Sequence, residues 1–169
     1  SVVLDGKFAD ALEAAVAAYA DPDMFVIEKA DDKVILRATG VGAHAAYLWE
    51  GKNALTHMMA VLGQLPLEGE LKEVVDFVNE HFGTCLYGEN MGVACSDDDC
   101  GPLTLNLGKI NVEDGKLVLC CDSRIPVAFT VDSIEEAVKA KMEGTAYSYE
   151  RVSTERPLYE PKDSALVQT

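Results

Sequence analysis

The sequence predicts an α+β fold of two halves, each an antiparallel sheet covered by helices on one face. Apolar residues recur at helical spacing in four segments, and strand-like runs form two pairs joined by short acidic turns. The order of elements is helix, hairpin, helix, and then helix, hairpin, helix, strand. Sheets with helices on one face are an expected way to bury such segments.

The first half is predicted as follows. Asp5 is placed to cap a helix over Gly6–Ala20, in which apolar residues form a single stripe. Two strands, Met24–Glu28 and Lys33–Thr39, are joined by an acidic turn into a hairpin. A second helix is expected over Asn53–Leu65.

The second half repeats this order without sequence identity to the first. Its hairpin turns at Glu113–Gly115, a strong turn signal, and Asp132–Ser133 begins a capping-box pattern for the last helix, which ends at Gly144. We therefore interpret both halves as ferredoxin-like in type. The other predicted elements are a helix at Glu70–Phe82, a long surface loop at 84–101, strands at Leu103–Val112, Lys116–Cys121 and Thr145–Val152, and a helix start at Asp163–Val167.

Composition excludes several classes of function. The chain has 169 residues, of which 49% are hydrophobic and 25% charged, as in ordinary globular proteins. Its net charge of −15 argues against binding to nucleic acids or anionic membranes. No apolar run approaches a membrane span, and the first residues do not form a signal peptide. Five cysteines, an odd number, indicate free thiols in a reducing compartment, so we expect a cytoplasmic protein.

His44 is the first candidate for a catalytic residue. It follows the strand that ends at Thr39 and is flanked by Gly40, Gly42 and alanines, which leave an imidazole accessible from several sides. Such a histidine can donate a hydrogen bond to a substrate oxygen. The alternative is a loop histidine that only caps a main-chain carbonyl.

Two further residues are candidates. Asn53 stands immediately before an apolar helix, so it is expected as an N-cap, and it can also fix the His44 loop. Arg124 follows a strand and precedes Ile125–Pro126, and its planar guanidinium suits a carboxylate. The alternative for Arg124 is a surface arginine paired with Asp122.

Other polar residues are interpreted as structural. The segment Cys95–Cys100 lacks the second ligand pair of a zinc site and the alternating carboxylates of a calcium loop, so it is predicted as a solvated acidic loop. His57 and His81 lie beside apolar helix stripes without a metal-binding spacing. We therefore expect no metal site within this chain.

Two segments, Gly42–Ala45 and Gly51–Ala54, resemble the G-x-x-A-H-x-x-x-P-x-x-G-x-N-A motif of dinuclear-zinc exopeptidases. This family includes carnosinase, acetylornithine deacetylase, succinyl-diaminopimelate desuccinylase and PepV-like bacterial dipeptidases. Gly101–Gly108 and Asp122–Pro126 are similar to two further segments of the PepV-like branch, and Pro157–Ser164 resembles its linker back to the catalytic domain. The resemblance covers nearly the whole chain, but only the lid, or dimerisation, domain of the larger enzyme.

The resemblance implies a domain arrangement and a set of roles. Residues 1–155 would be a lid with halves at about 1–66 and 67–155, and residues 156–169 a linker towards a missing catalytic domain. His44 would donate a hydrogen bond to the oxyanion formed from the peptide carbonyl, while Arg124 and Asn53 would be substrate-binding residues, Arg124 at the α-carboxylate. The two zinc ions would belong to the catalytic domain of a dipeptidase, and this chain alone would be inactive and monomeric.

Two features depart from the family pattern. Leu48 or Trp49 stands near the usual proline, and Ser1–Leu4 stands about where many members have Asn-x-Val-Pro. A different class of function is also open: a stand-alone α+β module that binds a ligand or partner at the His44 loop without catalysis. The sequence does not distinguish among a dipeptide, an acylated amino acid and a β-alanyl peptide as the substrate.

Overall fold

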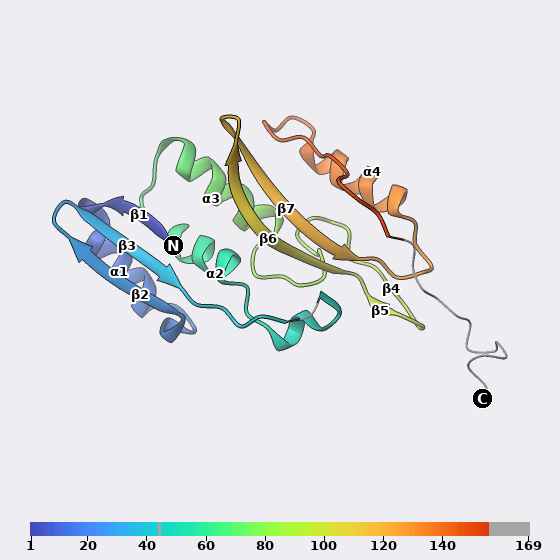
Figure 1. Ribbon diagram of the computed structural model, residues 1–169, viewed down its shortest axis with the longest axis horizontal. Coiled ribbons are helices and arrows are strands. Elements are labelled where there is room, and N and C mark those ends of the chain that lie inside the picture. Colours follow the sequence, from blue (N-terminus) through green and yellow to red (C-terminus); the bar gives the residue numbers. More distant parts are fainter. Residues whose placement is uncertain (44, 156–169) are drawn as a thin grey trace.

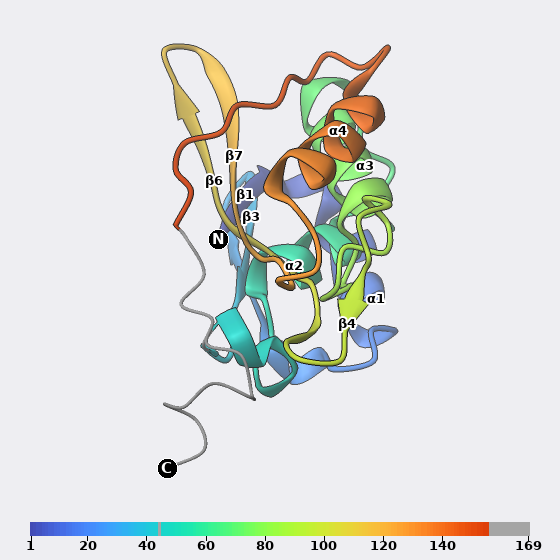
Figure 2. The same ribbon diagram turned by 90° about the vertical axis from the view of Figure 1, so that its right-hand side faces the viewer.

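The two larger antiparallel sheets lie on one side of the molecule and the helices on the other (Figures 1 and 2). The structure is a computed structural model that describes residues 1–43 and 45–155. Mixed helices and antiparallel strands confirm the predicted α+β class. The predicted helix start at Asp163–Val167 and the linker 156–169 lie outside the described residues.

The first sheet has the strand order β1-β3-β2, and both strand pairs are antiparallel. The predicted hairpin is confirmed, and Asp31 adopts the positive φ of 45° that its tight turn requires. Strand β1 was not predicted, because four residues give too short a pattern to identify. The elements of this part are β1 (Val2–Asp5), α1 (Ala9–Ala17), β2 (Phe25–Ala30), β3 (Lys33–Ala38) and α2 (Ala54–Leu62).

The second long hairpin pairs β6 with β7, and its turn uses positive φ at Asp114 and Gly115, as the sequence predicts. The register shifts between Leu107 and Lys109, which leaves Gly108 as a bulge. The elements of this part are α3 (Gly69–His81), β4 (Ser96–Asp97), β5 (Gly101–Pro102), β6 (Thr104–Glu113), β7 (Lys116–Arg124) and α4 (Val131–Met142).

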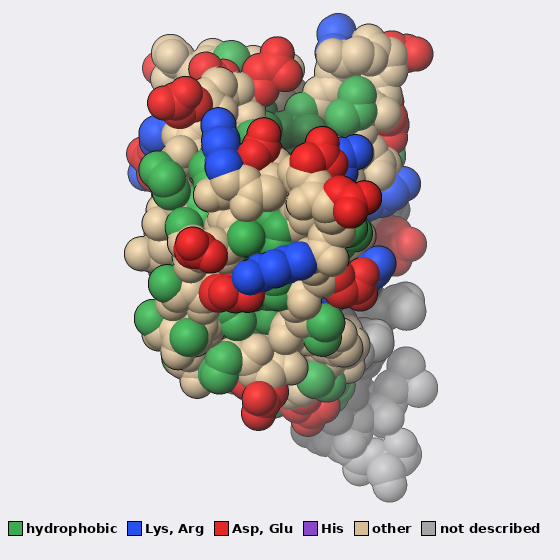
Figure 3. All heavy atoms as spheres, turned by 90° about the vertical axis from the view of Figure 1, so that its left-hand side faces the viewer, with side chains coloured by type: hydrophobic (Ala, Val, Ile, Leu, Met, Phe, Trp, Pro, Cys, Tyr) green, Lys and Arg blue, Asp and Glu red, His purple; other side chains and the backbone are tan. Residues whose placement is uncertain are grey.

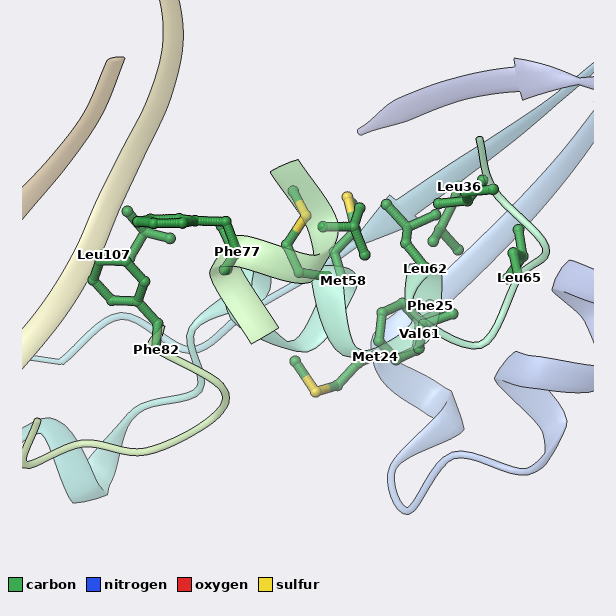
Figure 4. Close-up of a cluster of buried hydrophobic side chains, with 14 of the residues drawn as sticks. Met24, Phe25, Leu36, Met58, Val61, Leu62, Leu65, Phe77, Phe82 and Leu107 are labelled. Carbon is green, nitrogen blue, oxygen red and sulfur yellow. The ribbon is translucent and has the colours of Figure 1, made fainter. Parts of the chain in front are cut away.

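One hydrophobic core connects the two parts of the chain (Figure 4). It runs from Leu36 on β3, through Met58 and Leu62 on α2, to Phe77 on α3 and Leu107 on β6. Helices α2 and α3 pack against each other along this path. The two sheets are therefore held in a defined relation by shared buried side chains.

The segment 84–101 is more than the predicted surface loop. Met91 and Val93 are only 4% exposed and belong to the core, and β4 pairs with β5. Asp97 anchors the segment because its carboxylate accepts from the main-chain nitrogens of Asp99 and Cys100 and, across the fold, from Ala128. The sequence lacked periodicity here because these contacts involve loop residues, which follow no helix or strand period.

The predicted strand at Thr145–Val152 does not form. Side chains anchor this segment instead of a sheet: Tyr147 stacks on Phe77 of α3 with ring centroids 3.7 Å apart. The Nε of Arg151 donates to Glu135 at 2.5 Å, and its second nitrogen donates to Asp132 at 2.6 Å. Apolar alternation thus reflects packing onto helices here, and no sheet edge receives the segment within the described residues.

Two helix starts also differ from the prediction. Asp5 accepts from Lys7 N, as expected for a cap, but the first turn is a short 3-10 helix and α1 begins at Ala9. The N-cap of α4 is Thr130, whose hydroxyl accepts from Ser133 N at 3.1 Å, two residues before the predicted start. Element boundaries are the least reliable part of a sequence-based prediction.

Charged side chains of both signs are interspersed on the face that carries β1, β2 and α1 (Figure 3). Several are paired, as Lys29 is with Glu13 at 2.7 Å. No basic patch that would suit nucleic acid is visible on this face. Within the described ranges, no helix is both long and apolar enough to cross a membrane.

Candidate functional site

The loop that carries position 44 is closed at its neck by a two-residue antiparallel bridge. Val41 N donates to the carbonyl of Lys52 at 3.0 Å, and Lys52 N donates back to the carbonyl of Val41 at 2.9 Å. The chain thus leaves β3, forms a loop of ten residues, 42–51, and returns to the same place before α2 begins. His44 itself lies outside the described residues, so its predicted role stays a prediction.

Glycines allow this neck to close. A β-carbon at Gly40 would lie 2.4 Å from the carbonyl oxygen of Lys52, and one at Gly51 would lie 2.8 Å from the carbonyl oxygen of Val41. Gly42, by contrast, has open space around its α-carbon. Two of the three glycines near His44 are therefore required by close main-chain contacts.

The far end of the loop lies against the second hairpin. The segment Ala45–Glu50 forms two 3-10 turns separated by a kink at Tyr47, and it contacts both β6 and β7. Leu48 within it is buried. Tyr47 and Trp49 on either side of Leu48 are about half exposed and pack edge to face, with centroids 5.5 Å apart. The loop of the first half is thus seated on the sheet of the second.

Asn53 joins the two halves by its side chain. Its Oδ1 accepts from Leu55 N at 2.9 Å and Thr56 N at 3.3 Å, which confirms the predicted N-cap of α2. Its Nδ2 donates to Asn106 Oδ1 and to the carbonyl of Leu107, both at 2.8 Å. These four bonds use the full hydrogen-bonding capacity of an asparagine side chain.

Arg124 is exposed at the end of β7, directly opposite Thr104. It forms no ion pair with Asp122, the structural alternative that the sequence left open. Because side chains alternate along a strand, Arg124 shares a face of the hairpin with Asp122 and its partner Asn106. The guanidinium and the Asn53 anchor therefore lie on the same face, at the same end of the hairpin.

A pocket of about 310 Å³ separates the loop neck from β6. Glycine and alanine residues line it together with larger residues, among them Leu48, Asn53 and Asn106. The complete lining is Gly40, Val41, Gly42, Ala43, Leu48, Gly51, Lys52, Asn53, Ala54, Leu55, Leu86, Asn106, Leu107 and Gly108. Of the candidate residues that the structure describes, Asn53 lines this pocket and Arg124 does not. Both halves of the chain contribute to the wall.

His57 has contacts that sequence reasoning missed. Its Nδ1 lies 2.7 Å from the hydroxyl of Tyr19, and Lys52 nearby forms an ion pair with Asp21. Burial, and secondarily the charge of Lys52, lower the pKa of His57 below its ordinary value. In the tautomer protonated at Nε2, the neutral ring accepts at Nδ1 from the tyrosine hydroxyl. Tyr19 is 38 residues away in the sequence, so no local pattern could have revealed the pair.

Potential metal ligands do not gather in the described part of the chain. No group of three or more His, Cys, Asp or Glu side chains there could hold a metal ion. Cys95 and Cys100 are free thiols, and the pKa of the Asp97 carboxyl is lowered chiefly by the main-chain hydrogen bond from Cys100. The acidic loop is thus held by main-chain hydrogen bonds to Asp97, two from within the loop and one from Ala128.

Comparisons with known proteins relate the chain to peptidases. Residues 32–150 match the family model of the peptidase dimerisation domain. A beta-Ala-Xaa dipeptidase of Lactobacillus delbrueckii subsp. lactis is 30% identical over 141 residues, which cover 82% of this chain and 30% of that protein. The Bacillus subtilis protein named "Putative dipeptidase YtjP" is 27% identical over 138 residues, 81% of this chain and 29% of its own length. The chain therefore spans about 30% of the length of these relatives.

Proposed function

Because the chain belongs to the peptidase dimerisation domain family, we propose that it is the lid domain of a metal-dependent dipeptidase. The observation that carries this proposal is the match of most of the chain to relatives named as dipeptidases. The closed loop against the second hairpin supports it, since that loop contains the position expected to act on the substrate. Fold alone would not indicate this activity.

His44 is proposed to donate a hydrogen bond to the oxyanion that develops on the peptide carbonyl. The described part of its loop is held at the neck by paired main-chain bonds and seated on β6 and β7, so the loop would be held in place before the substrate binds. A donor that needs no rearrangement stabilises the transition state most effectively.

Arg124 is proposed to bind the free α-carboxylate of the dipeptide. Its exposure leaves the guanidinium accessible, and a planar guanidinium can bind a carboxylate through two parallel hydrogen bonds. We propose that Asn53 contributes to substrate binding indirectly, by fixing the His44 loop, because its own side chain is fully occupied.

The described residues do not fit a dinuclear metal site. We therefore assign the metal, proposed as two zinc ions, to sequence that the longer relatives have beyond the region of similarity. Elemental analysis of this chain after dialysis should find no stoichiometric zinc. About one tightly bound zinc per chain would contradict the assignment.

The assembly and location of the protein are also proposals. The two joined halves are proposed to take the place of a dimer, so the isolated chain should scatter light as a monomer at micromolar concentration; a doubled mass would favour a dimeric lid. All five cysteines are free, which suits a reducing compartment such as the cytoplasm.

Arg124→Ala in the full-length protein tests the proposed function. Dipeptides with a free carboxylate should show a raised KM, while their carboxamide analogues, which lack the charge, should be affected much less. Arg37→Ala is the matched control, because Arg37 is an exposed strand arginine paired with Glu28 on the other sheet. A stand-alone binding module would instead show no dipeptide hydrolysis in the full-length protein.

A further inference from the structure

Asn106 on β6 has no role in the function proposed so far, but it contacts the base of the loop that carries position 44. Its Oδ1 accepts the hydrogen bond from Asn53 Nδ2 at 2.8 Å, and it lines the pocket of about 310 Å³. Asn53 follows Lys52, the residue that closes the loop neck. A displacement of Asn106 would therefore be transmitted directly to the base of the loop.

Asn106 is also tied to the position of Arg124. Asn106 pairs with Asp122 across the hairpin, and Thr104 pairs with Arg124, so the two residues are diagonal neighbours on one face. Diagonal neighbours in an antiparallel pair lie about 7–8 Å apart. No bulge interrupts the ladder between these pairs, since the register shift begins only after Leu107. The spacing from Asn106 to Arg124 is consequently fixed by regular strand geometry.

We propose that Asn106 is a positioning residue that selects substrates by length, because it sets the spacing between the residue-44 loop and Arg124. This inference rests on the proposed function, in which the loop binds the scissile carbonyl and Arg124 binds the terminal carboxylate. In an ordinary dipeptide, one α-carbon separates the scissile amide from that carboxylate. A dipeptide that ends in β-alanine has one more methylene there, which lengthens the separation by up to ~1.5 Å.

A fixed spacing between the loop and Arg124 should strongly favour the ordinary dipeptide over the dipeptide that ends in β-alanine. Misplacement by about 1 Å can cost on the order of a hundredfold in rate. The Asn53–Asn106 bond crosses between the two halves and is backed by the bond from Asn53 to the carbonyl of Leu107. Removal of the Asn106 acceptor should let the loop shift relative to Arg124. The kcat/KM of the longer substrate should then rise relative to that of the shorter one.

The experiment compares alanyl-alanine with alanyl-β-alanine as substrates of the full-length protein. The measured quantity is the ratio of their kcat/KM values, which should favour alanyl-alanine by at least about tenfold in the wild type. Asn106→Leu keeps the approximate size of the side chain and removes the acceptor. It should lower the ratio at least about fivefold. Asn53→Asp keeps the helix cap but removes the donor, so it should act in the same direction if Asn106→Leu fails to fold.

Two controls separate spacing from general disturbance. Asn106→Asp retains an oxygen that can accept from Asn53, and its charge near Arg124 affects both carboxylate substrates alike, so the ratio should stay within about twofold of the wild type. Asn111→Leu changes an asparagine on the same strand that donates only to the nearby Glu113, and it should leave the ratio unchanged.

The outcomes distinguish this inference from the proposed function. A folded Asn106→Leu protein with the wild-type ratio would overturn the role of Asn106 while dipeptide hydrolysis stands. A wild-type kcat/KM ratio near one for the two substrates would also overturn the role of Asn106 while dipeptide hydrolysis stands. If the wild-type protein hydrolysed neither substrate, the proposed function would fail, and the role of Asn106 with it.

Discussion

The α-carbon of Gly40 packs so closely against the carbonyl of Lys52 that a β-carbon there would lie 2.4 Å from the oxygen. The same carbonyl accepts the hydrogen bond from Val41 N that closes the loop neck. Glycine at position 40 is therefore a condition for the closed loop, independent of any role in catalysis.

Replacement of Gly40 by alanine should open this neck. The added methyl group must displace main-chain atoms, so Gly40→Ala should lower the free energy of unfolding by about 1–3 kcal/mol in chemical denaturation. Gly42→Ala is the matched control, since nothing lies within 4 Å of its β-carbon position, and its effect should stay within about 0.5 kcal/mol. Equal effects would mean that the neck does not depend on the close approach.

Asn53 should contribute more to stability than an ordinary helix cap. Asn53→Ala removes the cap of α2 and also both donors to β6, so it should cost about 2–3 kcal/mol in urea unfolding. Thr130→Ala removes only the cap of α4 and should cost about 1 kcal/mol. Similar losses in the two variants would show that the bridge between the halves adds no stability.

The ion pair between Arg151 and Glu135 should make stability depend on acid pH. The hydrogen bond from Arg151 lowers the pKa of Glu135 from its ordinary value of 4.5 to about 2. A lowered folded-state pKa stabilises the protein above pH 4.5, and this contribution is lost as the pH falls towards 2. Urea unfolding should find Glu135→Gln less stable than the wild type at pH 6, with the difference shrinking below pH 4.5. Glu136→Gln, at an exposed neighbouring position, should show no such convergence.

His57 should titrate below its ordinary pKa of 6.5. Burial lowers the pKa most, followed by the charge of Lys52. As the pH falls through 6.5, His57 binds a proton in the unfolded chain before it does so in the folded protein. Protonation of His57 therefore lowers the free energy of unfolding in this range. NMR titration of the imidazole measures the pKa directly, and Lys52→Met should raise it. A His57 pKa that is unaffected by Lys52→Met would rule out this electrostatic coupling.

Local chemistry made the hairpins predictable. Asp31 and Asp114–Gly115 adopt positive φ, and these residue types tolerate that conformation, so both turns could be read from the sequence. The segment at Thr145–Val152 alternates like a strand, but Tyr147 and Arg151 pack onto α3 and α4 instead. Alternation records which side chains are buried, without specifying what buries them.

In the candidate site, too, the local contacts were predictable from the sequence and the contacts between distant residues were not. The cap formed by Asn53 involves residues two and three positions away and was predicted. Its bond to Asn106 spans 53 positions, and the contact of Tyr19 with His57 spans 38, so neither has a local signature. Arg124 could be identified as a candidate, but its place on the face of Asn106 required the register of β6 and β7.

The proposed role of His44 is catalytic and not structural. Glycine and exposed Ala43 precede His44, so its truncation should open no core cavity. His44→Ala in the full-length protein should therefore keep its melting temperature and metal content close to those of the wild type. An oxyanion donor acts chiefly in the transition state, so its loss should lower kcat more than it raises KM.

Steady-state kinetics of His44→Ala with a dipeptide substrate measure the catalytic contribution of His44. We predict that kcat falls at least about a hundredfold, the effect of losing one oxyanion donor. A folded, metal-loaded His44→Ala enzyme with nearly normal kcat would rule out the catalytic role and leave His44 as a structural loop residue.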